Sequence, residues 1–291
     1  MVNRIPEAGL ADLPPFTERG APVEREEHCS VAAVRRIAAL LDLDPDNYHS
    51  GGPLPRGWHF FMLAGDTRRS ALRSDGFPGL GVPVPDLGLP RLMLGSRTVT
   101  YLEDIPIGAG VQRTSTVERI EHKSTKAGPL ALVTLVHELM LTPSGRRAVV
   151  ESQTYLLMPP RGPLPAANRI AAAEPVTAAH TKAVVPDATM LFQYSALGFN
   201  SHRIHIDRPY AVEVEGFPDL VVNGGLVTLL LTEFLRCEIG RAPSSLKVRH
   251  VAPLYCNQPM TLALDPADHG WKLRAFDHQH HLAVDMEVSV S

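Results

Sequence analysis

Apolar and polar residues alternate in eight stretches of the chain, with the two-residue period of half-buried β-strands. The clearest stretch is 282–290, where every second residue from Leu282 to Val290 is apolar and the intervening positions are mostly polar. The other expected strands cover 97–102, 111–120, 130–141 and 147–157 in the first half, and 246–251, 260–264 and 271–276 in the second. Gly- and Pro-containing turns separate many of them, so the pattern predicts antiparallel sheet.

Two segments carry a helical pattern instead. Residues 30–41 place apolar side chains on one stripe, with Ser30 as the expected N-cap. Residues 226–239 are apolar almost all round, and Gly240 follows as the expected C′ residue. A helix of this kind must be surrounded by protein, so we expect a sheet curled around the second helix.

Both halves of the chain use the same parts, a helix followed by four strands. In each half a proline (Pro106, Pro253) stands eight residues before a threonine in the first turn of a strand (Thr114, Thr261). A length of 291 residues fits two domains of about 150 residues. We therefore expect a duplication, with a first domain at 1–160, a Pro- and Ala-rich linker at 161–188 and a second domain at 189–291.

Composition narrows the class of protein without naming its chemistry. Hydrophobic residues make up 44% and charged residues 20%, which is typical of a globular chain. The net charge is −3 without long runs of one sign, which argues against a nucleic-acid or membrane partner. Three cysteines, no apolar leader segment and no apolar stretch of about 20 residues indicate a protein of the cytoplasm.

The densest polar cluster lies in the segment YSALGFNSHRIHIDRPY at 194–210. It contains six candidate site residues, Asn200, His202, Arg203, His205, Asp207 and Arg208. Soon after come Asn223, Gly224 and Gly225, which lead into the buried helix. Backbone N–H groups at a helix start, together with the positive end of the helix dipole, can receive a carbonyl or an oxyanion. A His/Asn/Asp cluster beside them could move a proton.

Plainer interpretations of this cluster stay open. The run from His202 to His205 could be an edge strand with a solvated polar face, and the glycines could simply allow tight packing. A metal site could use His202 and His205, or the later group His278, His280 and His281. The sequence lacks the helical H-E-x-x-H frame, which disfavours a metal.

The segment FNSHRIHID at 199–207 resembles the signature D-x-N-P-x-H-x-D of MaoC-like enoyl-CoA hydratases. Aligning the histidines places Asn200 at the motif aspartate and His205 at the catalytic histidine. The variant is similar to one branch, the type-2 hydroxyacyl-thioester dehydratases together with the mesaconyl-C4-CoA (3-methylfumaryl-CoA) and itaconyl-CoA hydratases. Other matching segments are GPLP at 52–55, WHFF at 58–61, LPRLM at 89–93, IEHK at 120–123, and the stretch 210–224.

The resemblance implies an α+β double hot-dog fold, in which each of two units wraps a curved antiparallel sheet around a central helix. The signature lies only in the second unit. The first unit would be degenerate and would shape the acyl and CoA pocket, with Trp58 and Arg91 as candidates. No separate cofactor is implied, because coenzyme A is part of the substrate, and a homodimer is expected.

The resemblance also assigns roles to the cluster. His205 would activate water, Asn200 would hold that water, and the amides around Asn223, Gly224 and Gly225 would receive the thioester oxygen. Asp207 or His202 would set the tautomer of His205. A free carboxylate on the acyl group would favour an arginine, for which the candidates are Arg203, Arg208, Arg91 and Arg249. Each of these arginines could equally be a surface residue paired with an acid.

These roles predict a hydro-lyase that adds water reversibly to a 2-enoyl-CoA. The expected substrate is a branched C5 dicarboxyl acyl-CoA, itaconyl-CoA or mesaconyl-C4-CoA, hydrated to citramalyl-CoA. The alternatives are a 3-hydroxyacyl-thioester dehydratase of fatty-acid or polyketide metabolism, a thioesterase on the same fold, and a non-catalytic acyl-CoA-binding protein.

Overall fold

The computed structural model describes residues 16–17, 19–125, 128–160 and 173–290. These residues form one eleven-stranded antiparallel sheet in the order β1-β4-β5-β6-β3-β8-β11-β10-β9-β7, with β2 also paired to β4. The strand bounds are β1 Phe16–Thr17, β2 Val23–His28, β3 Arg91–Tyr101, β4 Gly110–Thr125, β5 Gly128–Leu141, β6 Arg147–Met158, β7 His180–Val184, β8 Pro243–His250, β9 Met260–Ala267, β10 Gly270–Phe276 and β11 Leu282–Val290.

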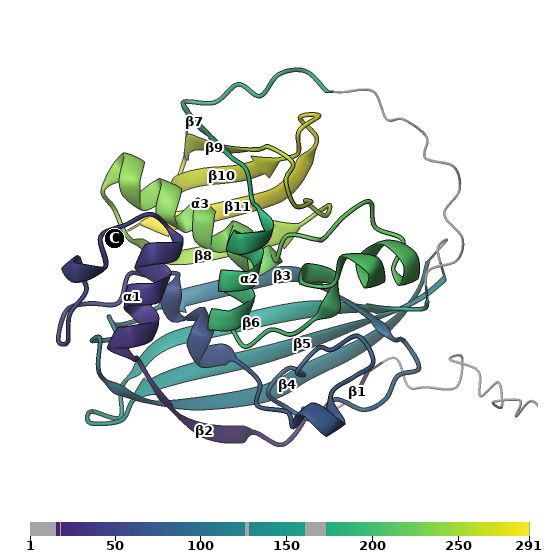
Figure 1. Cartoon of the computed structure of the whole chain (residues 1–291). Helices are drawn as coiled ribbons and strands as arrows, with labels where there is room; N and C mark the ends of the chain where they lie inside the picture. Colours follow the sequence, from purple (N-terminus) through teal and green to yellow (C-terminus); the bar gives the residue numbers. More distant parts are fainter. Residues whose placement is uncertain (1–15, 18, 126–127, 161–172, 291) are drawn as a thin grey trace, which may run out of the picture.

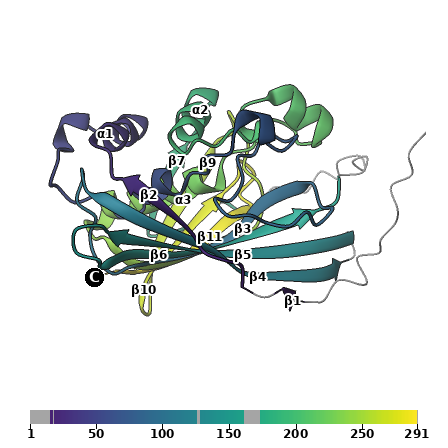
Figure 2. The same cartoon turned by 90° about the horizontal axis from the view of Figure 1, so that it is seen from below.

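The helices lie on one face of this sheet (Figures 1 and 2). The α-helices are α1 Val31–Leu40, α2 Ala188–Leu197 and α3 Gly224–Ile239. Shorter 3₁₀ and π turns span Pro45–Asn47, Trp58–Leu63, Arg69–Ala71, Arg203–His205 and Tyr210–Val214. No helix in the described part of the chain has both the length and the apolar character needed to cross a bilayer.

The predicted duplication is confirmed by the order of the elements. The first half runs β2, α1, the 3₁₀ helix Trp58–Leu63 and β3–β6, and the second half runs β7, α2, α3 and β8–β11. Strand β2 pairs with β4 as β7 pairs with β9, and the two halves meet where β3 pairs with β8. An isolated bridge precedes the central helical turn in each half, Pro53–Pro106 and Val221–Tyr255.

The two halves differ in their central helix. In the second half α3 takes this place with 16 residues, and most of its apolar side chains are buried, as the sequence pattern predicts, although Cys237 near its end is exposed. In the first half the equivalent place holds only the six-residue 3₁₀ helix Trp58–Leu63, and α1 packs beside α2 instead. The helix at 30–41 therefore corresponds to α2, and the expectation from the sequence that it matches the helix at 226–239 is wrong.

Periodicity located the other elements closely. The eight expected strands appear with bounds shifted by a few residues, and Gly240 ends α3 in the left-handed conformation at φ 68°. Helix α2 was not predicted, although Asp187 caps it by accepting a hydrogen bond from the Met190 amide at 2.8 Å. Strand β7 falls inside the range 161–188 assigned to the linker, and residues 161–172 lie outside the described residues.

Candidate active site

A cavity of about 200 Å³ opens at the N-terminus of α3, between the two halves of the molecule. The second half supplies the signature residues Asn200, His202 and His205 and the helix start at 223–225. The first half supplies side chains from the 3₁₀ helix Trp58–Leu63, from the loop that follows it and from β3, β5 and β6. The cavity is therefore completed only where the two halves meet.

The signature folds as a tight turn rather than an edge strand. Residues Arg203–His205 form one 3₁₀ turn, and the His202 and His205 side chains are buried. The Asn200 side chain begins this turn, because its Oδ1 accepts a hydrogen bond from the His202 amide at 3.1 Å. Its Nδ2 group remains as a donor at the cavity wall.

The tautomer of His205 is fixed by a backbone carbonyl. Its Nδ1 lies 2.7 Å from the Val221 oxygen, and since a carbonyl can only accept, Nδ1 carries the proton and Nε2 keeps its lone pair. Burial, together with neighbouring His202, lowers the pKa of His205 to about 3. The imidazole is therefore neutral at physiological pH and can act as a base. The expectation that Asp207 or His202 sets this tautomer is wrong.

His202 packs against His205 and faces an acidic group from the first half. The two imidazole rings meet edge to face at 5.5 Å, and His202 Nε2 lies 3.9 Å from Asp75 Oδ2. Burial, with a further contribution from Arg73, lowers the pKa of His202 to about 3. His202 thus forms a neutral wall of the cavity that holds the His205 ring in place.

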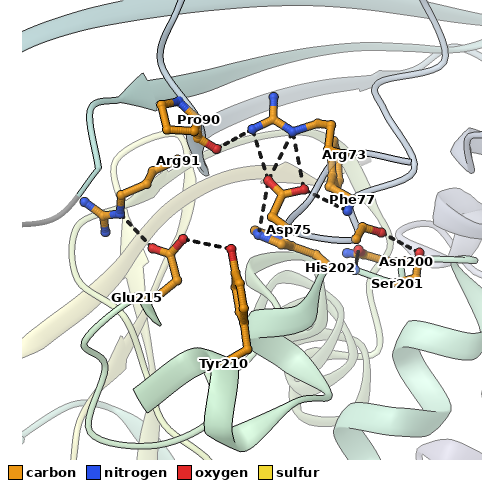
Figure 3. Close-up of polar contacts among 11 residues, drawn as sticks. Arg73, Asp75, Phe77, Pro90, Arg91, Asn200, Ser201, His202, Tyr210 and Glu215 are labelled. Atoms are coloured by element: carbon orange, nitrogen blue, oxygen red, sulfur yellow. Dashed lines mark hydrogen bonds and ion pairs between the residues drawn. The ribbon is translucent and has the colours of Figure 1, made fainter. Parts of the chain in front are cut away.

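The loop between the 3₁₀ helix Trp58–Leu63 and β3 holds the signature turn from outside (Figure 3). Ser201 Oγ donates to the Gly76 carbonyl at 2.6 Å, and the Arg203 amide donates to the Asp75 carbonyl at 2.8 Å. The buried Asp75 carboxylate accepts from Arg73 Nε at 3.1 Å and from the Phe77 amide at 2.9 Å. This contact between distant segments was not predicted, because the Gly/Pro-rich stretch 51–90 has no periodic pattern.

The start of α3 offers unoccupied amide groups. Asn223 is the N-cap residue, but its side chain makes no capping hydrogen bond, and the first intrahelical bond is that of the Val227 amide. The earlier amides, including those of Gly224 and Gly225, have no partner within the helix. Asn223 Nδ2 donates to Ser195 Oγ at 3.2 Å, while its Oδ1 is buried with no partner among the described residues. The helix start predicted from the sequence therefore presents backbone N–H groups at the cavity, and its role as an oxyanion site stays a prediction.

Close packing requires glycine at both positions of this helix start. A Cβ on Gly225 would lie 2.1 Å from the Tyr194 hydroxyl, and a Cβ on Gly224 would lie 3.0 Å from His250 Cε1. Tyr194 and His250 both line the cavity. The absence of a side chain at Gly224 and Gly225 therefore allows this close packing and also leaves their backbone open to a ligand. His250 was not among the predicted site residues. Its Nε2 is buried without a partner in the described chain, and burial lowers its pKa to about 3.

Asp207 lies outside the cavity and stabilises the signature turn instead. Its Oδ2 accepts from Arg203 Nε and Nη2 at 2.9 and 2.7 Å, and its Oδ1 accepts from the Tyr210 amide at 3.1 Å. The Arg203 hydrogen bonds lower the pKa of Asp207. The Arg203 guanidinium in turn covers the Tyr210 ring, 4.1 Å from its centroid. Asp207 therefore does not reach the reacting groups.

The arginines proposed from the sequence are all paired with acids away from the main cavity. The pairs are Arg203 with Asp207, Arg208 with Asp219, Arg91 with Glu215 and Arg249 with Asp285. Trp58 is also displaced from its expected role, because it is fully buried and donates from Nε1 to Glu233 of α3 at 3.0 Å. The expectation that Trp58, Arg91 and these other arginines line the acyl site is wrong.

The arginine that does line the cavity is Arg97 on β3. It is 6% exposed and binds the fully buried Glu151 through Nε at 2.8 Å and Nη2 at 3.0 Å. Glu151 also accepts from His59 Nε2 at 2.7 Å and from Gln153. Burial acts to raise the pKa of Glu151, but the Arg97 charge and the His59 hydrogen bond outweigh it and hold that pKa well below its usual value.

Strand parity could have revealed Arg97 in the sequence. In β3 the side chains of Arg97, Val99 and Tyr101 are buried while those of Thr98 and Thr100 are exposed. A strand of period two that places Val99 in the core must place Arg97 on the same face.

No group of three or more His, Cys, Asp or Glu side chains within the described ranges is arranged to hold a metal ion.

Comparison with known proteins supports the resemblance that the signature at 199–207 indicates. Residues 57–256 match the family model described as "Hydroxyacyl-thioester dehydratase type 2". The mesaconyl-C(4)-CoA hydratase of Chloroflexus aurantiacus is 36% identical over 243 residues, which cover 81% of this chain and 84% of that protein.

Solved structures share the fold at lower sequence identity. A MaoC-like dehydratase from Phytophthora capsici superimposes with a TM-score of 0.67 at 14% identity, covering 94% of this chain and 95% of that one. A conserved hypothetical protein from Mycobacterium tuberculosis, described as a double hotdog fold, gives a TM-score of 0.55 at 14% identity and covers 96% and 97% of the two chains. The fold is thus the α+β double hot dog expected from the sequence.

Proposed function

Because the chain belongs to the hydroxyacyl-thioester dehydratase type 2 family, whose members are hydro-lyases, we propose that it hydrates a 2-enoyl-CoA at the cavity beside α3. The observation that carries this proposal is the Nδ1–H···O=C bond from His205 to Val221. It leaves a neutral imidazole with a free lone pair next to the open amides of Gly224 and Gly225. A base beside an oxyanion site is the arrangement that addition to a conjugated thioester needs.

In the proposed reaction His205 Nε2 takes a proton from water while the water oxygen bonds to the β-carbon. The electron pair of the double bond moves toward the thioester oxygen, which gains enolate character and is stabilised by the Gly224 and Gly225 amides. The imidazolium then returns the proton to the α-carbon, so that H and OH are added in balance. Asn200 orients the water through Nδ2, since its Oδ1 is occupied by the His202 amide.

For the substrate we propose a branched C5 dicarboxyl acyl-CoA, with mesaconyl-C4-CoA ahead of itaconyl-CoA and citramalyl-CoA as the product. The identity to the Chloroflexus hydratase supports this choice.

A substrate panel tests the function. Purified protein is incubated with mesaconyl-C4-CoA, itaconyl-CoA, crotonyl-CoA and a long-chain 3-hydroxyacyl-CoA, and products are separated by mass. Citramalyl-CoA formation from mesaconyl-C4-CoA supports the proposal, whereas turnover of the long-chain compound alone would make the chain a 3-hydroxyacyl-thioester dehydratase. Binding of all four without turnover would make it an acyl-CoA-binding protein.

The homodimer stays a prediction. Gel filtration with light scattering measures the molar mass in solution and so tests it.

A further inference from the structure

We propose that Arg97 is the specificity-determining residue of this site and binds the free carboxylate at the distal end of the acyl group. The inference rests on the proposed function, because it names the part of the dicarboxyl substrate that the first half of the molecule recognises. Arg97 lies on β3, on the face of the sheet that turns toward α3, and its side chain is part of the cavity wall.

The bonding of Arg97 leaves donors for a ligand. A guanidinium offers five N–H groups, and the hydrogen bonds from Nε and Nη2 to Glu151 use two of them. Nη1 makes no hydrogen bond to any residue in the described part of the chain. A second carboxylate can therefore bind the same guanidinium from the cavity side while Glu151 holds it from behind.

Glu151 fixes the orientation of the Arg97 guanidinium and leaves some of its N–H groups for a ligand. The carboxylate of Glu151 is fully buried and is itself fixed by His59 and Gln153. Gln153 is directly opposite Arg97 across the β3–β6 pair, and its Oε1 accepts from the Tyr155 hydroxyl at 2.7 Å. The long Arg97 side chain is thereby held in one orientation before substrate arrives, which reduces the entropy cost of binding.

Other polar groups gather in the same cavity wall. His137 on β5, Gln153 and Tyr155 on β6 and His250 on β8 all line the cavity together with Arg97. The imidazole of His137 is bound through Nδ1 to Ser115 Oγ at 2.8 Å. Gln153 and the Tyr155 hydroxyl are already paired, but an apolar acyl chain pressed against this wall would leave the remaining N–H groups of Arg97 unpaired, which is costly. A carboxylate would satisfy them, so the wall selects for an acyl group with a polar end.

The charge of the pair does not exclude a second anion. Arg97 and Glu151 neutralise each other, and an added carboxylate would bring one negative charge into the cavity. The positive end of α3 opens into the same cavity and offsets part of that charge. The other arginines considered for this role are engaged by carboxylates that do not line the cavity, so within the described chain Arg97 is the arginine that a substrate in this cavity can reach.

The test compares two substrates that differ only in the group Arg97 would bind. Mesaconyl-C4-CoA carries a carboxylate on its β-carbon, and 3-methylcrotonyl-CoA carries a methyl group there. The double variant R97Q/E151Q removes both charges together, so that neither is left buried alone. We expect kcat/KM for mesaconyl-C4-CoA to fall about 10- to 100-fold, the range for losing a hydrogen bond to a charged group, and kcat/KM for 3-methylcrotonyl-CoA to change less than about threefold.

Matched controls separate recognition from folding. The variant R274Q/D265N removes an Arg–Asp pair between β10 and β9, away from the cavity, and should leave the substrate ratio unchanged. The variant R97K keeps the charge but loses the planar fork, and should give an intermediate loss on mesaconyl-C4-CoA. Thermal unfolding of each variant checks that the fold is retained.

Each outcome has one meaning. Equal losses on both substrates in R97Q/E151Q and in R97K would assign Arg97 a structural role and overturn the proposal. A wild-type protein that hydrates 3-methylcrotonyl-CoA as well as mesaconyl-C4-CoA would overturn it too, while leaving the hydratase function intact. A wild-type protein that hydrates neither of these compounds, nor crotonyl-CoA, would instead overturn the proposed function.

Discussion

Four histidines in the cavity wall make the stability of this protein sensitive to acid. Burial lowers the pKa of His137 to about 4 and the pKa of His202, His205 and His250 to about 3. The ordinary value in an unfolded chain is 6.5. The perturbation is a change of pH from 7 to 5, which protonates these side chains in the unfolded chain but not in the folded protein.

The sign and size of the change in the free energy of unfolding follow from the linkage between proton binding and folding. Because the folded pKa values are depressed, the unfolded state binds more protons below pH 6.5, and stability is lost as the pH falls from 6.5 toward 3. Each histidine should lower the free energy of unfolding by about 2 kcal/mol between pH 7 and pH 5. The four together amount to about 8 kcal/mol, which is comparable with the whole stability of a typical domain, about 5–15 kcal/mol.

Urea unfolding at pH 7, 6 and 5 measures this loss directly. The variant His137→Gln, which removes one of the four titrating groups, should reduce the pH dependence by about a quarter. Activity gives a second measurement, because neutral His205 stays competent as a base and kcat/KM should show no midpoint near 6.5 while the protein is folded. An unfolding free energy that changes by less than about 1 kcal/mol from pH 7 to pH 5 would refute the reasoning.

Substitutions at four further positions test individual contacts. Replacing His205 by Ala should lower kcat by about 10³-fold or more with an unchanged circular dichroism spectrum, and a fall of less than about tenfold would remove it as the base. Asn200→Asp should keep high activity, because one carboxylate oxygen can accept from the His202 amide and the other can orient the water by accepting a hydrogen bond from it, in place of the Nδ2 donor. Asn200→Ala without loss would exclude the orienting role. Asp75→Ala should lower kcat about tenfold by loosening the signature turn, and Asp75→Asn should restore most of it, since Oδ1 still accepts from the Phe77 amide. Trp58→Phe should cost about 1.5–3 kcal/mol in urea unfolding by removing the buried hydrogen bond to Glu233, with KM unchanged.

Local periodicity was sufficient to predict most of the fold. The alternating strands, the buried helix at 224–239 and the left-handed Gly240 each follow from the spacing of apolar residues within a single segment. The short 3₁₀ helix Trp58–Leu63 did not follow, because its segment carries no helical repeat and is fixed by packing against α3. Tertiary packing decided that element, as it does for many short helices.

The site was predictable where chemistry depends on residue type and unpredictable where it depends on a distant backbone atom. His205, Asn200 and the two glycines that begin α3 could be selected from the sequence, and all of them line the cavity. The carbonyl of Val221, which sets the His205 tautomer, and the Asp75 loop, which braces the turn, are joined to the signature only by the fold. Arg97 was not predicted, although the alternation of buried and exposed residues along its strand places it on the same face as Val99.

Hydration of mesaconyl-C4-CoA in deuterium oxide tests the central claim most directly. If His205 returns a solvent-derived proton to the α-carbon, the product should be citramalyl-CoA with one non-exchangeable deuterium on the carbon next to the thioester, and no free thiol should appear. The same reaction with the His205→Ala variant should give no product. Release of free coenzyme A, or a citramalyl-CoA product without deuterium at that carbon, would contradict the assignment of this chain as an enoyl-CoA hydratase, whereas unchanged mesaconyl-C4-CoA would contradict the proposed substrate.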